Sequence, residues 1–186
     1  QYEAVMTGNT NSLSALPSQY SGNPNRPVEK VSWDDVQIFL TRLNASEQEA
    51  GRLPSGWSYV LPTEAQWEYA CRAGTTTVYS WGNDINSSRA NYNWDGSATS
   101  GVDFKHTRDV GMYDPNEWGF FDMHGNVVEW VRDWYGDYNG NLTDPEGPAK
   151  GLKKVLRGGY WRNGESLLRS ACRKSFEPNN NYWSWG

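Results

Sequence analysis

The stretch Asp122-Met123-His124-Gly125-Asn126-Val127-Val128-Glu129-Trp130 contains the features that decide the fold. Asp122 and Glu129 supply carboxylate oxygens near its two ends, and Gly125 allows a turn that directs backbone carbonyls inward. Mixed carboxylate and carbonyl oxygens are the ligands that calcium prefers. The histidine and asparagine beside the glycine could also hydrogen-bond across a tight turn that holds no metal. The spacing alone leaves both interpretations open.

Two helices are predicted before this loop. Ser32 has the place of an N-cap, with Asp35 as its capping-box partner, and the apolar spacing that follows predicts a helix at about 33–50. Thr63 caps a second predicted helix, which Gly74 ends.

The rest of the chain predicts short strands and long ordered loops. The end of a helix is expected at 2–6, and loops are expected at 9–30 and 75–118. Strands are expected within 51–60 and at 118–121, 127–134, 154–161, 167–173 and 183–186. This pattern indicates one irregular, loop-rich α+β domain that spans 1–186 and is truncated at both ends.

Composition narrows the class of protein. Aromatic residues make up 15% of the 186 residues, with 11 Trp and 11 Tyr, so we expect a core built from large amphipathic rings. The net charge is -5 and no basic stretch occurs, which disfavours nucleic acid as a partner. No apolar run approaches the length of a membrane span, and no compartment is indicated.

The cysteines and histidines offer little for catalysis. Cys71 and Cys172 have no spacing that requires a bridge, and a free, buried thiol is expected at Cys71. The chain has only two histidines, His106 and His124, so it offers too few nitrogen and sulfur ligands for a usual zinc or iron site. A Ser-His-Asp triad stays open, since triads are recognised by geometry, but no nucleophile elbow occurs.

The C-terminal stretch 160–185 mixes aromatic rings with Asn, Ser and Arg, the side chains of adaptable recognition surfaces. A loop that covers the aromatic core is the alternative interpretation. The candidate ligand-binding residues are Tyr160, Arg162, Asn163, Glu165, Cys172, Lys174, Asn180, Tyr182, Trp183 and Ser184.

Several ordered motifs resemble the formylglycine-generating enzyme (sulfatase-modifying factor) family. They are the loop quoted above with its preceding Trp118–Phe121, together with Leu61–Ala70, Tyr79–Gly82, Ala90–Tyr92, Val155–Gly159 and Leu168–Ala171. The resemblance covers roughly 30–186 and implies an irregular variant of the C-type lectin fold. It also implies structural calcium, with Asp122, Gly125, Val127 and Glu129 as ligands at one site. A second site would begin at Asn91 and Tyr92, with Asp103 as a match further on.

Function follows less directly from the resemblance. The oxidases of this family bind copper through two cysteines after the Gly-Gly pair. Here Tyr160–Arg169 contains no cysteine, and the corresponding positions lie near Asn163 and Glu165, so we expect no copper, which as Cu(I) prefers thiolates. Other members are variable proteins diversified by retroelements, which use the same segment as a ligand-binding face. We therefore expect a non-catalytic domain that binds an unknown protein or small ligand. An oxygen-dependent metalloenzyme and a structural accessory domain of a larger protein are the alternatives.

Overall fold

The computed structural model describes residues 1–93, 105–138, 140 and 142–181. Loops connect a small number of helices and strands in this part of the chain, which confirms the loop-rich α+β class. The elements are α1 (Tyr2–Met6), α2 (Trp33–Glu49), α3 (Glu64–Arg72), β1 (Glu129–Trp134), β2 (Lys154–Arg157), the 3-10 helix η1 (Glu165–Leu167) and β3 (Lys174–Phe176).

The two longer helices begin at the predicted caps. Ser32 Oγ accepts a hydrogen bond from the Asp35 amide at 3.1 Å, and the Asp35 carboxylate accepts one from the Ser32 amide at 2.9 Å. Thr63 makes the same reciprocal pair at the start of α3. That helix ends at Arg72, and its C-cap residue Ala73, which directly precedes Gly74, has a φ of 47°.

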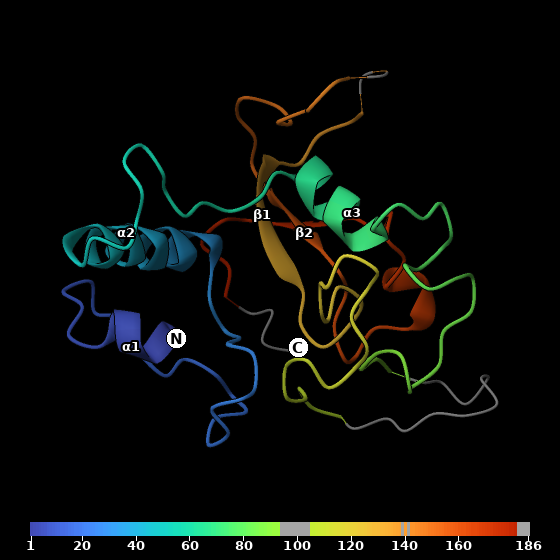
Figure 1. Cartoon of the computed structure of the whole chain (residues 1–186), viewed down its shortest axis with the longest axis horizontal. Helices are drawn as coiled ribbons and strands as arrows, with labels where there is room; N and C mark the ends of the chain where they lie inside the picture. Colours follow the sequence, from blue (N-terminus) through green and yellow to red (C-terminus); the bar gives the residue numbers. More distant parts are fainter. Residues whose placement is uncertain (94–104, 139, 141, 182–186) are drawn as a thin grey trace.

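The three strands form one antiparallel sheet in the order β1-β2-β3. Glu129 pairs with Arg157, and Lys154 pairs with Phe176. In Figure 1, α3 lies on one side of β1, while α1 and α2 pack together on the other side. The side of the sheet that faces α3 contributes to a buried cluster of Trp67, Cys71, Met123, Val131 and Val155.

Several predicted strands are absent or displaced. The segment 51–60 is almost entirely exposed and forms no strand, and 118–121 is a turn. The strand expected at 127–134 begins only at Glu129. The strand expected at 154–161 ends at Arg157, because Gly158 and Gly159 have φ values of 89° and 74°.

Buried and exposed side chains alternate at 167–173, but this segment does not form the expected strand. Leu168 and Ser170 are buried and Arg169 is exposed, but the Ser170 amide bonds to the Val78 carbonyl outside the sheet. The next strand along the chain, β3, begins only at Lys174. The strand expected at 183–186 lies outside the described residues. Within the described part of the chain, no helix is both long and apolar enough to cross a membrane.

Candidate functional site

The loop 122–130 ties together segments that are distant in the sequence. The Asn126 amide donates to the Asn91 carbonyl at 2.9 Å, and the Asn126 carbonyl accepts from the Trp161 amide at 3.2 Å. The side-chain oxygen of Asn126 also accepts from the Arg108 amide at 2.8 Å. Asn126 is therefore buried at a junction of three other segments, and it does not merely close its own turn.

Gly125 is required by this junction. Its φ is +87°, and a Cβ atom at this position would lie 2.3 Å from the Asn91 carbonyl oxygen. Both the left-handed backbone and the close approach exclude a side chain.

Two carboxylates of the loop are partly buried. One oxygen of Asp122 accepts from the Gly111 amide at 2.7 Å, while its buried Oδ1 has no partner among the described residues. Glu129 accepts from the Trp67 indole at 2.6 Å. Burial, together with the negative charge of Asp122, raises the pKa of Glu129 to about 7, although the Trp67 hydrogen bond lowers it. Burial also raises the pKa of Asp122.

This arrangement fits a divalent cation. Like charges withdrawn from water are unfavourable unless a positive charge compensates them. No group of three or more His, Cys, Asp or Glu side chains that could hold a metal occurs in the described residues. A cation beside Asp122 and Glu129 would therefore need backbone carbonyls, such as those of Gly125 and Val127, to complete its coordination.

The second predicted calcium position is only partly described. The Asn91 side-chain amide donates to the His106 carbonyl at 2.9 Å and to Asn126 Oδ1 at 3.2 Å. Its own Oδ1 is buried without a partner among the described residues. Tyr92 is buried nearby in the chain, and the third match, Asp103, lies outside the described residues.

His124 and Cys71 belong to the core. The Nδ1 of His124 lies 2.7 Å from the Leu168 carbonyl, and its Nε2 accepts from the Ser80 amide at 3.2 Å. Burial lowers the pKa of His124 to about 4 and raises the pKa of the Cys71 thiol to about 12. Both cysteines are free, as expected, and neither the buried imidazole nor the buried thiol is suited to catalysis.

Three candidate binding residues form one connected group in the C-terminal segment. The Lys174 ammonium donates to Asn163 Oδ1 at 2.7 Å and lies 5.1 Å from the centroid of the Tyr160 ring. The Asn163 amide donates to the Tyr160 carbonyl at 2.8 Å. Asn163 itself is buried, whereas Tyr160 and Lys174 are partly exposed.

The other candidates are more dispersed. Arg162 is exposed, and its guanidinium carbon lies 5.6 Å from the centroid of the Trp161 ring. Glu165 is exposed at the start of η1, Cys172 is partly buried, and the Asn180 amide donates to the Glu177 carbonyl. Tyr182, Trp183 and Ser184 lie outside the described residues.

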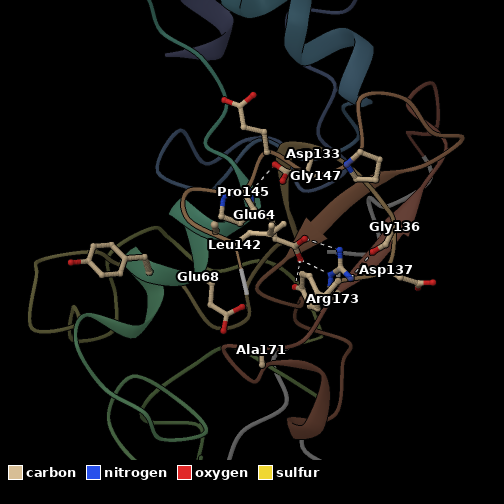
Figure 2. A pocket seen from close by; sticks show the side chains of 15 residues that line it. Glu64, Glu68, Asp133, Gly136, Asp137, Leu142, Pro145, Gly147, Ala171 and Arg173 are labelled. Atoms are coloured by element: carbon tan, nitrogen blue, oxygen red, sulfur yellow. Dashed lines mark hydrogen bonds and ion pairs between the residues drawn. The ribbon is translucent and has the colours of Figure 1, made fainter. Parts of the chain in front are cut away.

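Sequence reasoning missed a cavity of about 680 Å³ beside α3. Figure 2 shows that its walls come from α3, Asp133 of β1, parts of 136–138 and 142–148, and the residues that precede β3. In this wall the Arg173 guanidinium makes two hydrogen bonds of 2.7 Å to the Glu64 carboxylate. Its carbon lies 4.1 Å from the centroid of the Tyr138 ring. The contributing residues are widely spaced in the sequence and form no local motif, so no pattern indicated the cavity.

Comparison with known proteins identifies the scaffold. The family model described as "Sulfatase-modifying factor enzyme 1-like domain" matches residues 1–186. The formylglycine-generating enzyme of Streptomyces coelicolor is 35% identical over 183 residues, which are 91% of this chain and 54% of that protein. The serine/threonine-protein kinase pkn1 of Chlamydia pneumoniae is 41% identical over 124 residues, or 63% of this chain and 18% of the kinase. The chain thus spans about half of the first protein and a small part of the second.

A solved structure extends the likeness to the whole fold. Treponema denticola variable protein 1 superposes with a TM-score of 0.74 and 28% identity, over 96% of this chain and 76% of that one.

Proposed function

We propose that this chain, which belongs to the family of sulfatase-modifying factor enzyme 1-like domains, is a non-catalytic ligand-binding domain on a calcium-stabilised scaffold. Its binding face is the C-terminal segment that begins at Tyr160. The likeness to a variable protein supports this assignment. The observation that carries it is the way in which the core holds this segment.

The C-terminal segment is attached to the core through its main chain. The Asn163 carbonyl accepts from the Asn93 amide at 3.0 Å. The fully buried guanidinium of Arg157 donates to the carbonyls of Ser170, at 2.7 Å, and Cys172. Main-chain anchors do not depend on side-chain identity. The outward side chains of the segment can therefore change at little cost in stability, as surface substitutions usually do.

The outward side chains suit recognition. Tyr160 and Arg162 combine a large planar contact area with polar groups, and Lys174 adds a positive charge. Tyr160 and Lys174 are held together by Asn163, which limits the entropy that they lose when a ligand binds.

Calcium completes the proposed scaffold. Asp122 and Glu129 would hold the ion, together with the carbonyls of Gly125 and Val127. Asn91 and Tyr92 would contribute to a second ion, with Asp103 as a further ligand. The orphaned Asp122 oxygen and the raised pKa of Glu129 support the first position. The side-chain oxygen of Asn91, which has no partner in the described part of the chain, supports the second.

An oxygen-dependent metalloenzyme is the second candidate, because the similar proteins include formylglycine-generating enzymes. The residues present do not fit copper, since Tyr160–Arg169 contains no thiol and Asn163 is bonded to Lys174. Oxygen uptake by the copper-loaded protein with a cysteine-containing peptide would support this second candidate. We expect no uptake.

Exchange of surface side chains tests the proposed binding face. A peptide selected from a display library on the wild-type protein serves as the ligand. Tyr160→Ala and Arg162→Ala should weaken its binding while the melting temperature stays close to that of the wild type. Tyr59→Ala and Arg52→Ala are matched controls on another surface and should bind normally. If Tyr160→Ala and Arg162→Ala lose folding while the preference for ligands does not change, the segment is part of the core and the proposed binding face is wrong.

A further inference from the structure

The cavity beside α3 is separate from the proposed binding face, because two consecutive residues at the start of β3 have different contacts. Arg173 directly precedes the strand, and Lys174 is its first residue. Arg173 faces the cavity and contacts Glu64, whereas Lys174 contacts Asn163 in the proposed face. The cavity is therefore a separate candidate site.

The loop that encloses this cavity is closed tightly at its base. A Cβ atom on Gly136 would lie 2.6 Å from the Pro148 ring, and one on Gly147 would lie 3.1 Å from a carboxylate oxygen of Asp133. The backbone at Gly136 and Gly147 therefore approaches Pro148 and Asp133 too closely for a side chain to fit. The cavity is consequently a built feature of the fold.

Carboxylates dominate the charged groups of its walls, which contain five carboxylates and one guanidinium. Glu64 is bound by Arg173. Glu68 also forms ion pairs, with Arg72 and Arg157, and Glu146 forms one with Arg132. The remaining two, Asp133 and Asp137, have no lysine or arginine within ion-pair distance in the described part of the chain.

Asp133 is the more informative of these two carboxylates. It is 4% exposed, and one of its oxygens accepts from the Glu64 amide at 2.8 Å. Burial raises its pKa. A carboxylate in such a place is costly unless a positive charge compensates it. Among the described residues, Arg132 and Lys154 act on Asp133 electrostatically, but neither forms an ion pair with it. Asp137 is exposed and adds negative charge at the rim.

The other walls are largely apolar. Leu142, Pro145 and Pro148 come from the loop, and Tyr69 comes from α3. A volume of about 680 Å³ falls within the range of sites for small molecules. An apolar cavity whose charged groups are mostly of one sign selects ligands by shape and by opposite charge.

We infer that this cavity binds a small organic amine, with its ammonium group against Asp133 and an apolar or aromatic body against Leu142, Pro145 and Pro148. This site is independent of the C-terminal binding face. It accepts a cation that is not supplied by the chain itself.

Calorimetry with three matched probes tests this inference. The probes are phenethylamine, the neutral 2-phenylethanol and the anionic 3-phenylpropionate. A charged hydrogen bond to Asp133 should make the amine bind about tenfold or more tightly than the alcohol, and the anion should not bind. Equal binding of amine and alcohol, or no binding of the amine at millimolar concentration, would overturn the inference.

Variants locate the site. Asp133→Asn keeps an acceptor for the Glu64 amide and should remove most of the preference for amine over alcohol. Asp144→Asn makes the same charge change at an exposed position of the same loop that does not line the cavity, and should leave the preference intact. Equal effects of the two variants would contradict the assignment.

The three-probe comparison on the wild-type protein decides the question even if Asp133→Asn does not fold. Failure here would leave the peptide-binding test of Tyr160 and Arg162 unaffected, so the two proposals can fail separately.

Discussion

The Trp67 indole donates a 2.6 Å hydrogen bond to the Glu129 carboxylate, and this bond joins α3 to the first residue of β1. Among the described residues no other group donates to this carboxylate, whose pKa burial raises toward neutral pH. The bond therefore links the core directly to the proposed calcium loop.

Trp67→Phe should lower the free energy of unfolding by more than Trp130→Phe does. Both indoles are buried, and each substitution removes one hydrogen bond. Trp130, however, donates to the neutral carbonyl of Val31, whereas Trp67 donates to a carboxylate. A bond to a charged group contributes about 1.5–3 kcal/mol, and a neutral one contributes about 1 kcal/mol. Urea unfolding of both variants in calcium measures the difference. Equal losses of unfolding free energy would show that Trp67 does not bond to a charged Glu129.

Removal of calcium should destabilise the protein mainly at high pH. Without metal, folded Glu129 has a pKa raised from 4.5 to about 7, so the folded state holds a proton that the unfolded state has released. Stability then falls as the pH rises from 4.5 through 7. We expect a chelator to lower the melting temperature by several degrees at pH 8 and by less at pH 5, because the proposed calcium ion would bind only the folded state.

Glu129→Gln should abolish the response to calcium and chelator, while it keeps an acceptor for Trp67. Glu117→Gln, at an exposed position, should respond as the wild type does. An identical melt of the wild-type protein with and without chelator at pH 8 would count against the site.

His124 should remain neutral down to about pH 4. Its pKa is lowered by burial from 6.5 to about 4, so the unfolded chain takes up a proton at a higher pH than the folded protein does. The contribution of His124 to stability is therefore present above pH 6.5 and is lost as the pH falls toward 4. An NMR titration of its ring measures this directly, and a midpoint near 6.5 would refute the buried, neutral imidazole.

Gly125→Ala should prevent folding or destabilise the protein severely. The new Cβ would meet the Asn91 carbonyl at 2.3 Å in addition to the strain of a φ of +87°. Gly74→Ala has the same φ but nothing within 4 Å, so it should show the backbone strain alone, about 1 kcal/mol. Thermal melts of the two variants separate the steric effect from the strain. Similar melting temperatures would mean that the junction relaxes around the methyl group.

Local patterns in the sequence predicted those elements whose stabilising interactions lie within a few residues. The capping boxes at Ser32 and Thr63 lie within four residues, so the starts of α2 and α3 were predictable. The ordered motifs were specific enough to predict the family scaffold. Strands were less predictable, because alternating burial near Leu168 arises from contacts outside the sheet.

The sequence by itself determined the scaffold of this protein: its helix starts, its glycine-dependent loop and its family resemblance, all of which depend on residues close together in the chain. Only the tertiary structure decided what those residues meet. It placed the Glu129 carboxylate against Trp67, and Asn163 beneath Lys174. It also placed the buried Asp133 in a cavity wall, where no described lysine or arginine forms an ion pair with it. Burial and charge compensation depend on contacts between distant segments, and no spacing in the chain encodes them locally.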